Sequence, residues 1–126
     1  MTPNDRKYAK SHEWIKIEGN VGLIGITDHA QKALGDITFV EMPAIGKKIS
    51  AGGTCGVVES VKAASDIYTP VSGEVVAVNN DVDSAPELIN QDPYGKGWIL
   101  KLRMYDAEQL KSLLDAAGYD ATVQEA

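Results

Sequence analysis

The 126-residue sequence contains one cysteine, Cys55, and two histidines, His12 and His29. A single cysteine excludes an internal disulfide framework and a cysteine-based zinc site. The histidines do not have the His-Glu-x-x-His spacing of a metal site. No apolar run approaches the length of a transmembrane span, and the N-terminal stretch MTPNDRKYAKSHEW lacks the features of a signal or transit peptide. We therefore expect a small, metal-free protein of a reducing compartment, the cytoplasm.

Positive charge is also scarce, because 12 Lys and Arg residues stand against 18 Asp and Glu residues, for a net charge of −6. This balance argues against proteins that bind nucleic-acid phosphates or anionic membranes. No lysine or arginine occurs between Lys62 and Lys96, but six carboxylates do: Asp66, Glu74, Asp81, Asp83, Glu87 and Asp92. Two interpretations stay open, a solvated acidic surface and a docking face for partners with basic rims.

Catalytic motifs are missing as well. The sequence has no nucleophile elbow, phosphate loop or dinucleotide fingerprint. We interpret His12 and His29 as surface or capping side chains, and Cys55, in the apolar run GTCGVVES, as a buried, inert thiol. The sequence therefore does not predict a stand-alone enzyme.

Short strands separated by glycine-rich turns dominate the rest of the chain. Alternating polar and apolar residues predict strands at 13–17 and 21–26, joined by a Gly19-Asn20 turn. Further strands are expected at 36–42, 54–61, 67–71, 74–78 and 98–104. The pair 67–71 and 74–78 is separated by a Ser72-Gly73 turn signal. This pattern is typical of a small, mostly β fold, an antiparallel barrel or sandwich.

Three helical segments are expected. Thr27 is a suitable N-cap for a short internal helix over 28–34, which Gly35 would end. A capped helical turn is expected at 84–89. Asp106, with Gln109 three residues later, predicts the start of a C-terminal helix over 106–117. We expect Gly118 to end that helix and residues 119–126 to form a loosely held tail.

The segment GVVESVKAASDIYTPVSGEVVAV contains two apolar runs on either side of a polar centre with Lys62. If the runs pair as a hairpin, Lys62 lies at or next to its tip. It could be an ordinary solvated lysine, a nucleophilic amine or an acceptor of a modification. The nearest charges in sequence, Glu59 and Asp66, stabilise the ammonium form and oppose a nucleophilic role. The hairpin setting favours an acceptor over a nucleophile.

Several longer stretches resemble the H proteins of the glycine cleavage system, which carry a lipoyl group. The matching stretches are YAKSHEW, VGLIGITDHAQKALGDITFVEMP, VVESVKAASDIYTPVSGEVVAVN and PELINQDPYGKGW. The resemblance implies a barrel-sandwich hybrid, with residues 1–126 as a single lipoyl-carrier domain and a lipoyl-binding core over about 21–104. It also implies that Lys62 carries lipoic acid in amide linkage, as N6-lipoyllysine.

The resemblance further implies a monomeric shuttle that is not itself an enzyme. A pyridoxal-phosphate glycine decarboxylase would load the aminomethyl group of glycine. A tetrahydrofolate-dependent aminomethyltransferase would unload it, and an FAD- and NAD-dependent dihydrolipoyl dehydrogenase would reoxidise the dithiol. A lipoate ligase or a lipoyl/octanoyl transferase would attach the cofactor.

The same resemblance suggests which side chains hold the cationic aminomethyl group. Carboxylates would hold it by charge-assisted hydrogen bonds, and Glu13 and Asp66 are the candidates. Ser11, Ile26 and Leu34 are expected to line the same pocket, and Ala33 could leave the arm more room. The alternative interpretation is that Glu13 is an exposed strand residue and Asp66 a turn residue.

Two other carrier functions use the same lysine. An H-like relay would donate lipoyl groups from Lys62 to other proteins, and the sequence does not separate it from the glycine-cleavage shuttle. A biotinyl domain would have methionine on both sides of the lysine, where this chain has Val61 and Ala63. A lipoyl domain of an acyltransferase would normally continue into a linker and a catalytic domain.

Overall fold

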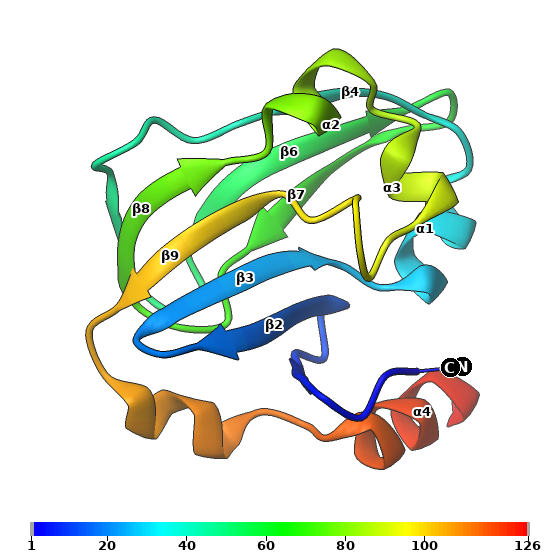
Figure 1. The fold of residues 1–126 in the computed structure, drawn as a ribbon. Helices are drawn as coiled ribbons and strands as arrows, with labels where there is room; N and C mark the ends of the chain where they lie inside the picture. Colours follow the sequence, from blue (N-terminus) through cyan, green and yellow to red (C-terminus); the bar gives the residue numbers. More distant parts are fainter. Residues whose placement is uncertain (1, 126) are drawn as a thin grey trace.

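Two antiparallel sheets pack around a shared core in the computed structural model, which describes residues 2–125 (Figure 1). The larger sheet has the order β1 (Lys7–Tyr8), β2 (Glu13–Glu18), β3 (Val21–Ile26), β9 (Leu100–Met104), β8 (Gly73–Val78) and β5 (Lys48–Ile49). The smaller sheet has the order β4 (Ile37–Glu41), β6 (Thr54–Ser60) and β7 (Ala64–Tyr68). The mostly β prediction is confirmed.

The core forms because apolar side chains alternate along the strands. In β9, Leu100 and Leu102 are fully buried, whereas Arg103 is exposed and Lys101 is half-buried. Ile67 from the smaller sheet belongs to the same buried cluster. Each such aliphatic side chain contributes about 1.5–3 kcal/mol when it is removed from water. None of the helices within residues 2–125 has the length and apolar character of a membrane span.

The internal helix α1 (Asp28–Leu34) has the predicted bounds. The Thr27 hydroxyl accepts a hydrogen bond from the Ala30 amide at 3.2 Å, and Gly35 ends the helix with a φ of 79°. Asn90 then ties the segment after α1 in place: its side chain donates to the Gly35 carbonyl and accepts from the Ile37 amide, both at 2.9 Å. The start of β4 is therefore held next to α1.

The helical turn predicted at 84–89 is wrong in its position. The structure has two short helices instead, α2 (Asn80–Ser84) and α3 (Leu88–Gln91). Asn79 caps α2 by accepting from the Asp81 amide at 3.1 Å, whereas Glu87 precedes α3 without a side-chain capping bond. The side-chain amide of Asn79 also donates to the carbonyls of Lys96 and Trp98, so this side chain fixes both α2 and the loop before β9.

The strand predicted over 67–71 is displaced, and the Ser72-Gly73 turn signal does not join it to the next strand as a hairpin. β7 ends at Tyr68 and pairs with β6, whereas β8 lies in the other sheet between β9 and β5. Residues 69–72 connect the two sheets instead of forming a hairpin. Thr69 stabilises this crossing, because its amide donates to the Gly53 carbonyl at 3.0 Å and its hydroxyl to the Val71 carbonyl at 2.6 Å.

The continuous helix predicted over 106–117 is two helices, a 3-10 helix η1 (Ala107–Ser112) and α4 (Ala116–Glu125). Asp106 caps η1 as predicted, by accepting from the Glu108 amide at 3.0 Å. The chain straightens at Leu114, whose amide and carbonyl both bond the Tyr8 backbone at 2.8 Å. The tertiary pairing with β1 therefore interrupts the helical pattern.

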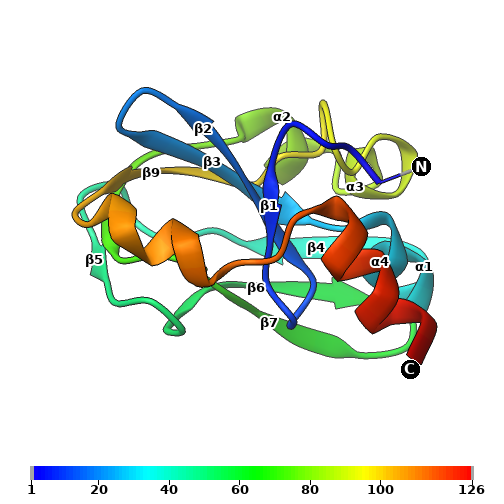
Figure 2. The same cartoon turned by 90° about the horizontal axis from the view of Figure 1, so that it is seen from below.

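The predicted ends of the C-terminal region differ for the same reason. Gly118 lies inside α4, where its amide donates to the Asp115 side chain at 2.7 Å. Tyr119 is 1% exposed and stacks on Tyr8 with 5.0 Å between the ring centroids, so it does not belong to a loose tail. Figure 2 shows α4 beside β1. The predicted tail also includes Ala126, which lies outside the described residues.

Candidate functional site

Lys62 lies at the tip of the hairpin formed by β6 and β7, which confirms the pairing expected around it. Ser60 closes the tip: its backbone amide donates to the Ala63 carbonyl at 2.8 Å. The Ser60 hydroxyl oxygen also accepts from the amides of Lys62 and Ala63, each at 3.2 Å. The backbone that displays Lys62 is therefore a hydrogen-bonded turn.

The Lys62 side chain is exposed, and its amine makes no ion pair within the described residues. Its stem runs past Gly35, since a Cβ placed on Gly35 would lie 3.4 Å from Lys62 Cε. The Val61 amide donates to the Asp36 carbonyl at 3.1 Å, which joins the tip to the segment after α1 (Figure 1). Lys62 is thus accessible to another protein and lies close to the C-terminal end of α1.

A cleft of about 160 Å³ opens between β2, α1 and the β6–β7 hairpin. All five residues predicted to line a pocket contribute to it: Ser11, Glu13, Ile26, Leu34 and Asp66. The other lining residues are His12, Ala30, Ala33, Val58 and Ser65. Leu34 directly precedes Gly35, so the cleft lies next to the segment that contacts the Lys62 stem.

Glu13 is the buried polar group of this cleft. It is 2% exposed, so its interpretation as an exposed strand residue is wrong. The Ser11 hydroxyl donates to Glu13 Oε1, and the Tyr68 amide donates to Glu13 Oε2 at 3.1 Å. Burial disfavours the charged carboxylate and raises the pKa of Glu13 to about 7, although both hydrogen bonds act in the opposite direction. Glu13 can therefore change its protonation state near neutral pH.

Asp66 provides the second carboxyl group and differs from Glu13 in its exposure. It lies in β7 rather than in a turn, opposite Val57 of β6, and its side chain is exposed. The Tyr68 hydroxyl lies 3.5 Å from Asp66 Oδ2. The cleft thus combines a buried carboxyl group on β2 with a solvated one on β7.

Sequence reasoning missed the place of His12, which was interpreted as a surface or capping residue. His12 is half-buried, lines the cleft and lies 2.7 Å from the Tyr119 hydroxyl through Nδ1. Burial, and to a lesser degree His29, lower the pKa of His12. Because His12 directly precedes Glu13, a predicted pocket residue, the sequence did contain a sign that His12 lies near the cleft. The prediction for Cys55 is confirmed, because the thiol is buried and burial raises its pKa to about 12.

Two packed antiparallel sheets that display a lysine at a hairpin tip have the architecture of a carrier domain. Within residues 2–125, no group of three or more His, Cys, Asp or Glu side chains could hold a metal ion. The model of the glycine cleavage H-protein family matches residues 6–126, and the chain belongs to this family. The H protein is a lipoyl carrier of glycine cleavage, a carrier component rather than a catalyst, as expected.

Similar proteins agree with this assignment over nearly the whole chain. A glycine cleavage system H protein from Carboxydothermus hydrogenoformans is 55% identical over 99% of this chain and 96% of its own length. One from Symbiobacterium thermophilum is 57% identical over 98% and 96% of the two chains. The crystal structure of a glycine cleavage system H protein from Mycobacterium marinum, 40% identical, has a TM-score of 0.89 and covers 97% of this chain and 98% of that one. The barrel-sandwich type of fold is therefore confirmed.

Proposed function

We propose that this chain carries lipoic acid in amide linkage on Lys62 and works as the shuttle of a glycine cleavage system. The observation that carries the proposal is the placement of an exposed lysine at a hairpin tip, beside a cleft that contains a buried carboxyl group. Attachment by a lipoate ligase or a lipoyl/octanoyl transferase requires an accessible amine, and the solvent-exposed Lys62 meets this requirement.

The residues of the cleft fit a lipoyl arm. Ile26, Leu34 and Val58 supply apolar wall for its hydrocarbon chain, and the small side chain of Ala33 leaves space between them. Lipoic acid would supply a cyclic disulfide that takes up the amine-bearing carbon of glycine and returns as a dithiol. The partners implied are the pyridoxal-phosphate glycine decarboxylase, the tetrahydrofolate-dependent aminomethyltransferase and dihydrolipoyl dehydrogenase.

The chain's own contribution is to hold a cationic amine and keep water from it. An amine that enters the cleft would stabilise the charged form of Glu13 and lower the pKa of this carboxyl group from about 7. Glu13 would then accept a charge-assisted hydrogen bond, with Asp66 of β7 as a second acceptor. Ser11 orients Glu13 through its own hydrogen bond. Excluding water from this site would slow hydrolysis of the cargo.

A tryptic mass spectrum after co-expression with a lipoate ligase tests the attachment site. Trypsin cleaves after an unmodified Lys62, whereas an acylated Lys62 should leave one long peptide from Ile49 to Lys96, heavier by a single lipoyl group. The control is Lys62→Arg, which remains a cleavage site and offers no amine to acylate. Continued cleavage at Lys62 in the presence of an active ligase would contradict the proposal.

A further inference from the structure

Tyr119 of α4 has a buried hydroxyl group that contacts two walls of the cleft, the β2 wall through His12 and the α1 wall through its N-cap Thr27. The hydroxyl oxygen is 2.7 Å from His12 Nδ1 and 2.7 Å from Thr27 Oγ1. His12 belongs to the wall that carries Glu13, and Thr27 is the N-cap of α1, which forms the other wall. One hydroxyl on the C-terminal helix therefore bonds both walls.

The direction of these hydrogen bonds follows from the donors available. The Thr27 hydroxyl accepts from the Ala30 amide and can donate its own proton to the Tyr119 oxygen. Burial raises the pKa of Tyr119 to about 12, so its hydroxyl keeps a proton at neutral pH and can donate it to His12 Nδ1. The chain Thr27, Tyr119, His12 then gives each of the two hydroxyl protons an acceptor.

The contact between Tyr119 and His12 involves a residue with an unusual backbone conformation. Among the described residues, His12 is the one non-glycine residue with a positive φ, at 78°. Such a conformation costs free energy and persists where the surroundings hold it. The His12 amide donates to the Ala9 carbonyl and its carbonyl accepts from the Thr27 amide, both at 3.0 Å. The bend at His12 lies between Ser11 and Glu13, whose side chains bond each other in the cleft.

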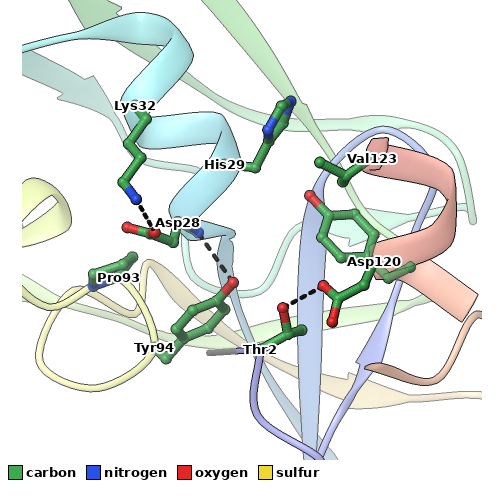
Figure 3. A pocket seen from close by; sticks show the side chains of 9 residues that line it. Thr2, Asp28, His29, Lys32, Pro93, Tyr94, Asp120 and Val123 are labelled. Carbon is green, nitrogen blue, oxygen red and sulfur yellow. Dashed lines mark hydrogen bonds and ion pairs between the residues drawn. The ribbon is translucent and has the colours of Figure 1, made fainter. Parts of the chain in front are cut away.

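Direct packing between α4 and α1 does not replace the Tyr119 contact. A crevice of about 450 Å³ separates the two helices, with Asp28, His29 and Lys32 of α1 on one side and Asp120 and Val123 of α4 on the other (Figure 3). The Tyr119 ring itself is held by its stacking on Tyr8. The hydroxyl is thus the polar link that reaches from α4 to both walls.

We propose that Tyr119 is a positioning residue for the carrier cleft: through His12 and Thr27 its hydroxyl holds the two walls together and keeps Glu13 buried. This role rests on the proposed function in one respect: Tyr119 protects cargo only if the chain carries a lipoyl group on Lys62. Its physical core, the dependence of the Glu13 environment on a hydroxyl of α4, is a property of the unlipoylated chain and can be tested without the cofactor.

The test is Tyr119→Phe in the full-length, unlipoylated protein, with the pKa of Glu13 measured by NMR titration of its side-chain carboxyl carbon. Phenylalanine keeps the ring stacked on Tyr8 and removes both hydroxyl contacts. Looser walls admit water to Glu13, so its pKa should fall by about half a unit or more. His12→Asn is the second variant, because asparagine tolerates a positive φ and lacks the imidazole; it should shift the titration in the same direction.

The matched control is Tyr8→Phe. It removes another tyrosine hydroxyl from the same stacked pair, one that donates to the Pro3 carbonyl at 2.6 Å and touches neither wall. The Glu13 titration of Tyr8→Phe should match that of the wild type. If Tyr119→Phe leaves the pKa of Glu13 unchanged, or if the control shifts it equally, the positioning role is wrong, whether or not Lys62 accepts lipoic acid.

With the lipoylated protein, the consequence for cargo can be measured separately. Carrier loaded by the decarboxylase should lose ammonia about threefold faster in Tyr119→Phe than in Tyr8→Phe. Equal rates would contradict the link between the Tyr119 contact and cargo protection. A protein that cannot be lipoylated would instead contradict the proposed function and leave the titration result standing.

Discussion

The hairpin tip and the cleft beside it differ in how far they expose their polar side chains to water. At the tip, Lys62 and its neighbours Val61 and Ala63 are exposed, and the turn is held by hydrogen bonds of Ser60 to the backbone. In the cleft, Glu13 is buried, hydrogen-bonded on both oxygens and poised to titrate near pH 7. The tip leaves the Lys62 amine in water, whereas the cleft removes the Glu13 carboxyl group from water.

Under the proposed function, this difference separates two tasks of a carrier. A group that several enzymes must reach needs exposure and a fixed backbone, and little else from its surroundings. A group that must hold a cation against hydrolysis needs a low dielectric, in which a charged hydrogen bond is stronger than in water. Variants at the tip should therefore change modification without changing stability, and variants in the cleft should change both stability and retention of cargo.

The largest effect is expected at the tip. Lys62→Arg should abolish lipoylation completely, since a guanidinium does not form the amide. The thermal unfolding temperature should stay within about 1–2 °C of the wild type, because an exposed substitution usually changes stability by about 0.5 kcal/mol or less. Intact mass and a melting curve measure the two outcomes.

The matched control for the tip is Lys111→Arg, at an exposed lysine of η1. Its lipoylation should equal that of the wild type. A strongly destabilised Lys62→Arg, or residual lipoylation of that variant, would contradict the division between tip and cleft.

The next effect concerns stability and pH in the cleft. Folding raises the pKa of Glu13 from 4.5 to about 7, so between these values the native state holds a proton that the unfolded state has released. The stabilisation from this group is complete below about pH 4.5 and is lost as the pH rises through about 7, by about 3 kcal/mol in total. Glu13→Gln should remove this fall, and denaturant unfolding at a series of pH values measures it.

Asp66→Asn is the matched control for the pH experiment, because it removes an exposed carboxylate from the same cleft. The wild-type pH dependence should persist in this variant. If Glu13→Gln and wild type lose stability in parallel between pH 4.5 and 7, Glu13 does not hold the predicted proton. The environments of the Glu13 carboxyl group and the exposed Lys62 amine would then differ less than the burial of Glu13 implies.

A smaller effect is expected on cargo. In the lipoylated protein loaded by the decarboxylase, Glu13→Gln should speed the loss of ammonia about tenfold, the value of one charge-assisted hydrogen bond of about 1.4 kcal/mol. Asp66→Asn should speed it about twofold, because a solvated acceptor holds the amine less tightly. An unchanged hydrolysis rate in the double variant Glu13→Gln, Asp66→Asn would exclude both carboxyl groups from holding the amine.

The fold could be predicted from sequence wherever a local signal matched the tertiary environment. The bounds of α1 agree because Thr27 and Gly35 mark them through their own backbone preferences. The break at Leu114 could not be predicted, since it depends on pairing with Tyr8, more than 100 residues away. The Ser72-Gly73 signal did not mark a hairpin turn, because Gly73 is the first residue of β8, and the sequence contains no local sign that the flanking strands lie in different sheets.

The candidate site shows the same limit. The residues around one cleft could be predicted from family-like motifs, and all five of them line it. The burial of Glu13 could not, because it results from Ser11, Tyr68 and both walls packing together. The role of Tyr119 was hidden because its hydroxyl meets His12 across a separation of 107 residues.

The smallest effect concerns how partners approach the tip and the surface around it. Five of the carboxylates between Lys62 and Lys96 have exposed side chains: Asp66, Asp81, Asp83, Glu87 and Asp92. Glu74 differs, because it pairs with Arg103 at 2.7 Å. If the exposed group is a docking face, binding to the decarboxylase should weaken about threefold between about 50 and about 300 mM NaCl, as salt screens exposed charges.

The double variant Asp81→Asn, Asp83→Asn sharpens this last comparison. It removes two charges from α2, outside the cleft and the hairpin tip, so lipoylation at Lys62 and the titration of Glu13 should keep their wild-type values. The salt dependence of partner binding should become shallower, because fewer charges attract a basic rim. Binding that does not respond to salt in the wild type would show that this acidic surface is a solvated face and that recognition lies with the tip and the cleft.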